Sequence, residues 1–256
     1  MPIAEARIVN DREAPLMFGP VEEVASAENR QIAGGIRARV YEPLEPPRGT
    51  LAYFHGGGWA VGGLDSHDGV ARFLCARTPC TVVAVEYAKA PERPFPAALE
   101  DAWAATRWTA FNLPKPLAIG GDSSGGNVAA VVARRARDSG IPLGLQLLVY
   151  PALDLRFDSH WMRQYLGGHP ADDPDASPAL AADLSGVAPA LILSCELDDL
   201  RPQADAYAER LKQAGVDVRH LVYPGLIHTA YRMPGVLPGA RRMLEDSAEA
   251  LAAAFA

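Results

Sequence analysis

One serine-centred turn constrains the fold of this chain more than any other feature of the sequence. The apolar run Leu117–Gly120 predicts a buried strand, and the helical pattern Gly125–Ser139 predicts a helix soon after it. Between them lies Gly-Asp-Ser-Ser-Gly-Gly, a G-x-S-x-G pattern centred on Ser123. Glycines on both sides of the serine let the two segments cross closely, and the sharp turn pushes the serine hydroxyl out of the sheet. We therefore predict a strand, a tight turn and a helix, with Ser123 exposed at the turn.

Short apolar runs alternate with longer helical patterns along the rest of the chain. The predicted strands are Ile36–Tyr41, Leu51–Phe54, Thr81–Val85, Leu117–Gly120, Leu145–Tyr150, Ala190–Ser194 and Val218–Tyr223. The predicted helices are Asp68–Arg77, Ala97–Phe111, Gly125–Ser139, Pro202–Ala214 and Val236–Ala254. This alternation predicts a mostly parallel sheet with helices on both faces, and 256 residues suit one such domain. Functional residues are then expected in loops at the carboxyl ends of the strands.

Composition excludes several classes of function. The net charge is −7 and no basic cluster occurs, so nucleic acid is not an expected partner. Three cysteines are too few and too unevenly spaced for a disulfide framework, and Cys75 and Cys80 are expected to be reduced. No His/Cys cluster has the spacing of a metal site. Because no leader or membrane-length apolar run is found, we expect a soluble, cytoplasmic protein without stable membrane insertion.

A glycine-rich loop follows the predicted strand Leu51–Phe54. It reads His55-Gly-Gly-Gly-Trp59. Consecutive glycines expose backbone N–H groups, which can stabilise negative charge that develops on a carbonyl oxygen under attack. We predict that Gly57 and Gly58 donate these N–H groups together with Ser124, the residue after the turn serine.

An acid and a base are expected after the last two strands. His228 follows the strand Val218–Tyr223, while Glu196, Asp198 and Asp199 follow the strand before it. A serine hydroxyl becomes a good nucleophile when an imidazole accepts its proton, and a carboxylate orients the imidazole. Serine, acid and histidine then follow one another along the chain. Spacing alone does not choose among the three carboxylates.

With these residues identified, the sequence resembles the hormone-sensitive-lipase-like family of carboxylesterases. The resemblance rests on HGGGW (His55–Trp59), GDSxGG (Gly121–Gly126), APExPFPAALEDA (Ala90–Ala102), YPxLD (Tyr150–Asp154) and D-x-LR (Asp198–Arg201). It implies the α/β-hydrolase fold and Asp198 as the acid of a Ser123–His228–Asp198 triad. It further implies hydrolysis of short to medium acyl esters of small molecules through an acyl-enzyme, without a cofactor, and it is compatible with a homodimer.

The sequence departs from the family pattern in three places. The family's HGF reads His228-Thr229-Ala230, and its DYRLAPE reads EYAKAPE over Glu86–Glu92. The chain is also short, so we expect one domain over residues 1–256 with an N-terminal cap remnant at about 1–35 and a reduced lid at about 154–177. The aromatic and apolar residues of that lid segment are Phe157, Trp161, Met162 and Tyr165. A smaller lid buries fewer CH₂ groups of a bound chain, which favours short acyl groups.

Two other functions fit parts of the same pattern. One is a non-catalytic ligand-binding module on this fold, because a fold does not determine a function. Such a module has no need for all three triad residues, and their presence favours an enzyme. The other is the same triad acting on a lactone or an amide, which the sequence does not distinguish from an ester.

Overall fold

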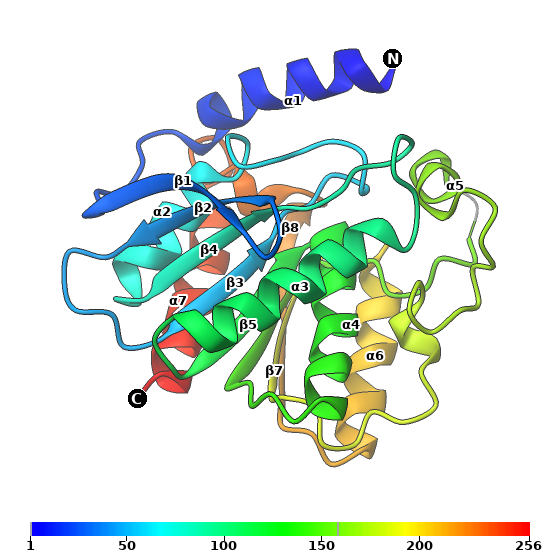
Figure 1. Ribbon diagram of the computed structural model, residues 1–256. Coiled ribbons are helices and arrows are strands. Elements are labelled where there is room, and N and C mark those ends of the chain that lie inside the picture. Colours follow the sequence, from blue (N-terminus) through cyan, green and yellow to red (C-terminus); the bar gives the residue numbers. More distant parts are fainter. Residues whose placement is uncertain (1, 158) are drawn as a thin grey trace.

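The computed structural model describes residues 2–157 and 159–256 and contains one eight-stranded sheet in that part of the chain (Figure 1). Its strands are β1 (Ser26–Ile32), β2 (Ile36–Glu42), β3 (Thr50–Phe54), β4 (Thr81–Glu86), β5 (Leu117–Asp122), β6 (Leu145–Val149), β7 (Ala190–Leu197) and β8 (Val218–Ile227). Their order in the sheet is β1-β2-β4-β3-β5-β6-β7-β8. β2 pairs antiparallel with β1 and β4, and all the other pairs are parallel. The predicted mostly parallel sheet is confirmed.

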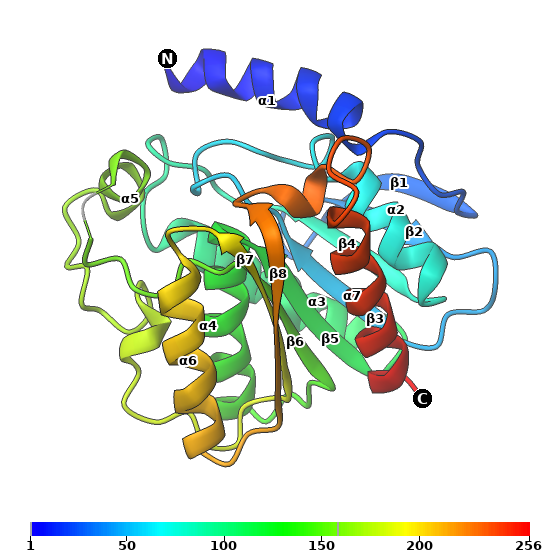
Figure 2. The ribbon, with the colours of Figure 1, turned by 180° about the vertical axis from the view of Figure 1, so that it is seen from behind.

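Helices cover both faces of this sheet. They are α1 (Ile3–Phe18), α2 (Asp68–Arg77), α3 (Ala97–Asn112), α4 (Ser124–Asp138), α5 (His160–Leu166), α6 (Arg201–Gln213) and α7 (Ala240–Ala254), with short 3₁₀ helices η1 (Pro178–Leu180) and η2 (Ala230–Arg232). α3, α4 and α6 pack on one face, and α2 and α7 pack on the other (Figures 1 and 2). α1 lies across the end of the molecule, apart from both layers (Figure 2). No helix in the described ranges is both long enough and apolar enough to cross a membrane.

The central strands are continuous apolar runs in the sequence because their side chains are buried on both faces of the sheet. All five residues of β3 are buried. Ala52 and Phe54 pack in the layer of α3, α4 and α6, whereas Leu51 and Tyr53 pack in the layer of α2 and α7. Alternate side chains of a strand point to opposite faces, so a strand between two helix layers has no polar positions.

All seven predicted strands and all five predicted helices are present, with shifts at their ends. The two largest shifts are four residues each: α7 begins at Ala240 rather than Val236, because Pro238 disfavours a helical residue before it, and β8 ends at Ile227 rather than Tyr223. The elements that were missed are α1, β1, the short helix α5 and the 3₁₀ helices η1 and η2. β1 is an edge strand of mostly polar, exposed residues, so it carries no hydrophobic pattern.

The segment expected to be an N-terminal cap remnant contains two different elements. β1 pairs with β2 along its whole length and therefore belongs to the sheet. Only α1 lies outside the sheet and its two helix layers. Met1 and Asp158, which fall in the two expected cap segments, lie outside the described residues. The three cysteines are buried and free.

A buried carboxylate ties the loop after β3 to the end of β5. Asp122, the last residue of β5, accepts hydrogen bonds from the Tyr53 hydroxyl at 2.8 Å and from the Gly56 N–H at 2.9 Å. His67 Nε2 lies 3.1 Å from the same carboxylate oxygen. A Cβ at Gly56 would lie 2.3 Å from the other oxygen, so only glycine fits there. The carboxylate therefore fixes where the glycine-rich loop begins.

Burial controls the charge of the side chains in this network. Burial and the neighbouring charges of His67 and Lys89 lower the pKa of His55 to about 3. Burial also lowers the pKa of His67, although Asp122 opposes the shift. Burial raises the pKa of the Asp122 carboxyl, but His67, Arg232 and the Tyr53 hydroxyl outweigh it and hold the pKa well below its usual range. Both histidines are therefore neutral in the folded protein at neutral pH.

This arrangement predicts a loss of stability in mild acid. Below about pH 6.5 the unfolded chain protonates His55 while the folded chain, in which the pKa of His55 is about 3, does not, so the unfolded state binds more protons and the free energy of unfolding falls as the pH falls. We expect His55 to contribute a slope on the order of 1 kcal/mol per pH unit between about pH 6.5 and 5, above the range in which ordinary carboxylates titrate, and the lowered pKa of His67 contributes in the same direction. Urea unfolding across this interval measures the slope. The variant His160→Gln, which changes an exposed histidine, should show the same slope as the wild type. A wild-type free energy of unfolding that does not change with pH over this interval would contradict the neutral buried histidines.

Candidate active site

Ser123 occupies the sharp turn between β5 and α4. Its φ of 54° and ψ of −115° lie in a region that residues with a side chain rarely adopt. Three backbone hydrogen bonds hold it there: the Ser123 N–H donates to the Val149 carbonyl at 2.8 Å, and the Ser123 carbonyl accepts from the N–H groups of Asn127 at 3.1 Å and Ala152 at 3.2 Å. The strained turn is thus fixed by the neighbouring strand β6 and by the first turn of α4.

The glycines around Ser123 are required because β3 passes directly against the turn. A Cβ at Gly121 would lie 2.4 Å from the carbonyl oxygen of Phe54, and a Cβ at Gly125 would lie 1.9 Å from that same oxygen. Neither distance leaves room for a side chain. The close crossing that the G-x-S-x-G pattern predicted is confirmed.

Ser123, His228 and Asp198 come together at the carboxyl ends of β5, β8 and β7. Ser123 Oγ lies 2.9 Å from His228 Nε2, and His228 Nδ1 lies 2.7 Å from Asp198 Oδ2. The side chain of Asp198 is 3% exposed and that of His228 is 33% exposed. These contacts allow His228 to accept the Ser123 proton while Asp198 orients the ring.

The structure distinguishes the three carboxylates that spacing left open. Asp198 contacts His228, and its second oxygen accepts the Leu200 N–H at 2.9 Å. Glu196 is exposed and accepts the Gly225 N–H at 2.7 Å instead. Asp199 is exposed. The pairing of β7 with β8 shifts between Cys195 and Leu197, just before this acid, and such irregularities change the direction of the side chains that follow.

The glycine-rich loop presents free N–H groups beside Ser123. Gly57 and Gly58 have φ values of 128° and 59°. The Gly57 carbonyl accepts hydrogen bonds from the Ala60 and Val61 N–H groups, which closes a tight turn. Over the described ranges, the N–H groups of Gly57, Gly58 and Ser124 donate to no protein acceptor. The three N–H groups predicted from the sequence as donors therefore have no acceptor among the described residues.

Aromatic side chains anchor this loop from the segment around α5. The rings of Trp59 and Tyr165 stack with centroids 4.1 Å apart and an interplanar angle of 4°. Trp161 lies over Gly58, where an added Cβ would come within 2.9 Å of its side chain. α5 therefore covers the loop, a contact that the sequence did not predict, because its seven residues give too short a pattern to identify a helix.

A cavity of about 580 Å³ opens above these groups. Its lining includes Gly57 and Gly58, Ser123, Phe157, Trp161 and Met162, Leu197 to Leu200, and Ile227 to Thr229 with Arg232. Four apolar side chains of this lining are partly exposed: Phe157, Trp161, Leu197 and Ile227. The site is thus a mostly apolar, open cleft with the triad at its base.

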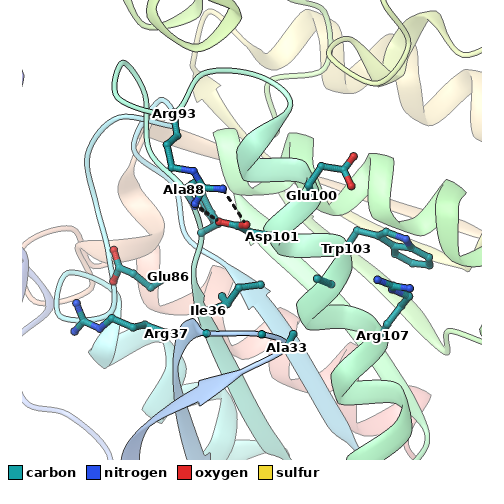
Figure 3. A pocket seen from close by; sticks show the side chains of 14 residues that line it. Ala33, Ile36, Arg37, Glu86, Ala88, Arg93, Glu100, Asp101, Trp103 and Arg107 are labelled. Atoms are coloured by element: carbon teal, nitrogen blue, oxygen red, sulfur yellow. Dashed lines mark hydrogen bonds and ion pairs between the residues drawn. The ribbon is translucent and has the colours of Figure 1, made fainter.

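A second cavity, of about 640 Å³, lies between the β1–β2 turn and α3 (Figure 3). There Asp101 accepts a hydrogen bond from the Ala88 N–H at 2.9 Å and pairs with Arg93 at 3.2 Å. Its lining includes no serine, cysteine or histidine. It is larger than the cavity above Ser123 but has no serine or cysteine paired with a histidine in its lining, so the cavity above Ser123 is the candidate active site.

Comparisons with known proteins agree with this geometry. Residues 51–232 match the model of a family described as alpha/beta hydrolase fold. Carboxylesterase NlhH of Mycobacterium tuberculosis is 38% identical over 236 residues, which cover 80% of this chain and 74% of that protein. An ethyl acetate hydrolase of Pseudomonas putida is 38% identical over 230 residues, which cover 79% of this chain and 72% of that protein.

A solved structure shows the same architecture. The hyperthermophilic esterase of the archaeon Pyrobaculum calidifontis superposes with a TM-score of 0.89 at 33% identity, covering 99% of this chain and 94% of that one. The match spans the strands, the serine turn and the loops that carry the histidine and the acid. This chain belongs to the hormone-sensitive-lipase-like family of carboxylesterases, which has the α/β-hydrolase fold.

Proposed function

We propose that this protein is a serine carboxylesterase that hydrolyses short-chain acyl esters through an acyl-enzyme. The observation that carries the proposal is the chain of contacts from Ser123 Oγ to His228 Nε2 and from His228 Nδ1 to Asp198, at the base of an open cavity. The names of the relatives point to the same chemistry.

The reaction follows from these contacts. Ser123 Oγ attacks the ester carbonyl carbon while its proton passes to His228 Nε2, and the carbonyl oxygen becomes the oxyanion of a tetrahedral intermediate. Asp198 stabilises the imidazolium that forms. His228 then returns the proton to the leaving alcohol, which gives the acyl-enzyme. Water, deprotonated by the same ring, attacks the acyl-enzyme and releases the acid and free Ser123.

The N–H groups of Gly57, Gly58 and Ser124 are proposed to stabilise the oxyanion. They are free to donate, and the loop that carries the two glycines is held by Asp122 at its start and by Trp59 and Tyr165 at its end. Donors fixed before the reaction need no reorganisation as charge develops, and loss of one such donor typically lowers the rate by about 10²–10³.

The preference for short acyl groups rests on how little of a long chain the cavity covers. The lid segment at about 154–177 contributes only α5 and its flanks, and Trp161 and Phe157 remain 38% and 42% exposed. Each CH₂ buried from water contributes about 0.8 kcal/mol, so a chain that reaches past these residues gains little binding energy. Because the lid segment is this small, we propose that residues 1–256 form one domain with a reduced lid.

Removal of the nucleophile or of the acid tests the proposal. Ser123→Ala should lower kcat for p-nitrophenyl acetate by about 10⁶, to the background rate. Asp198→Asn should lower kcat by about 10⁴, because the ring then takes the wrong tautomer. Initial rates with purified variants of matched fold measure both effects.

Two neighbours in the same cavity serve as controls. Ser159→Ala and Asp199→Asn alter side chains that line the cavity without contacting His228, and both variants should keep rates of the wild-type order. Equal losses in Asp198→Asn and Asp199→Asn would contradict the assignment of the acid.

A chain-length series tests the substrate preference. We expect kcat/KM for p-nitrophenyl esters to be highest at acetate or butyrate and to fall for decanoate and laurate, because the open cavity buries few of the added CH₂ groups. Measurement below the critical micelle concentration of each ester keeps the comparison fair. A higher kcat/KM for decanoate than for butyrate would exclude a short-chain esterase.

A further inference from the structure

Arg232 places a positive charge in the catalytic cavity without an ion-pair partner among the residues that the structure describes. It is the last residue of η2, four positions after His228, and it lines the same cavity as Ser123. Its Nη1 donates to Asn10 Oδ1 of α1 at 3.0 Å. Within residues 2–157 and 159–256, no carboxylate lies at ion-pair distance from its guanidinium.

The carboxylates that share a cavity with Arg232 are either engaged elsewhere or face solvent. Asp198 is bound to His228, and Asp122 is bound to Tyr53 and Gly56. Glu13, which lines an adjoining cavity of about 240 Å³ with Arg232, pairs with Arg12 at 3.0 Å. Asp199 is exposed to solvent. None of these groups forms a direct ion pair with Arg232, although the charge of Arg232 acts on Asp122.

The charge of Arg232 acts close to the reacting atoms. It is among the groups that hold the pKa of Asp122, the residue before the nucleophile, below its usual range. It is also half-buried, so water screens it less than it screens a surface arginine. A charge in this position affects any ionised group that a substrate brings into the cavity.

A role in holding α1 does not account for an arginine here. The bond to Asn10 uses one of the five N–H donors of the guanidinium, and a neutral glutamine amide could supply that donor. The remaining donors form a planar, cationic surface, which is the arrangement that binds a carboxylate through two parallel hydrogen bonds.

We propose that Arg232 binds a carboxylate carried by the substrate, so that the preferred substrates are short esters with a free acid group. This inference rests on the proposed esterase function and specifies its substrate class. The lining of the cavity combines Ile227, Thr229 and Arg232, close to His228 in sequence, with Trp161 and Met162 of α5. A substrate in this cavity then meets both apolar side chains and a cation.

Matched ester pairs test this proposal. One pair carries the acid on the acyl group: mono-p-nitrophenyl adipate against p-nitrophenyl hexanoate. The other carries it on the leaving group: 4-acetoxybenzoate against methyl 4-acetoxybenzoate. For each pair we define the preference as kcat/KM of the acidic ester divided by kcat/KM of the neutral ester. Comparing the preference between variants cancels the intrinsic reactivity of the esters.

We expect Arg232→Gln to lower the preference about tenfold or more in at least one pair, since a charged hydrogen-bonded contact is lost. Arg232→Lys keeps the positive charge but loses the planar guanidinium with its parallel N–H donors, so this variant should retain part of the preference for the acidic ester. Arg37→Gln is the matched control. It removes one positive charge from an exposed residue of β2 that lines the second cavity (Figure 3), and it should keep the wild-type preference. The wild-type preference should fall as sodium chloride is added.

Other outcomes overturn distinct claims. If both neutral esters are hydrolysed in a Ser123-dependent manner but Arg232→Gln leaves both preferences at the wild-type value, the carboxylate site is wrong and the esterase stands. If the wild type hydrolyses none of the four esters, the esterase function itself fails. If Arg232→Gln does not fold, Arg232→Lys and the salt dependence of the wild-type preference still test the carboxylate site. A wild-type preference that does not change with salt contradicts the proposal.

Discussion

The close crossing of β3 and the serine turn is the constraint on which the rest of the site depends. The carbonyl oxygen of Phe54, the last residue of β3, occupies the space that a Cβ would need at Gly121 or Gly125. Because the two backbones are in contact, the loop after β3 cannot move relative to Ser123 without breaking the packing. Ser123 and the N–H groups of the glycine-rich loop, the proposed nucleophile and oxyanion donors, are therefore positioned by the same contact.

Asp122 adds a polar contact to this steric one. It stands between Gly121 and Ser123 in sequence, and its side chain binds the start of the glycine-rich loop. A buried carboxylate is costly unless hydrogen bonds satisfy it, and here Tyr53, Gly56 and His67 do so. Burial of this network keeps His55 and His67 neutral inside the fold, which couples the order of the site to pH.

The sequence was informative where short patterns correspond to backbone requirements. The glycines around Ser123 and in the loop after Phe54 have steric reasons that the structure displays directly, and the buried parallel strands are recognisable as apolar runs. The polar edge strand β1 and the helices α1 and α5 were missed because their residues show no clear hydrophobic period. The contact between Trp161 and Gly58 could not be foreseen either, since it joins residues about 100 positions apart through packing alone.

The triad residues could be predicted from the sequence, whereas the other functional residue of the cavity, Arg232, could not. Ser123, His228 and Asp198 follow from motif order and from the family resemblance, and the structure brings them within hydrogen-bond distance. Arg232 carries no motif, and its relation to the site appears only once η2 folds back beside His228. Residues that set substrate choice lie in irregular segments after the strands, where sequence patterns are weakest.

The central claim, that Ser123 is a nucleophile activated by His228, is tested most directly by covalent labelling. Diethyl p-nitrophenyl phosphate phosphorylates an activated serine and stays attached, and peptide mass spectrometry locates the adduct. We expect one diethylphosphoryl group per chain, on Ser123, and a labelling rate that falls to background in His228→Gln. An adduct on Ser124, or equal labelling of the wild type and His228→Gln, would contradict the activated serine on which the account depends.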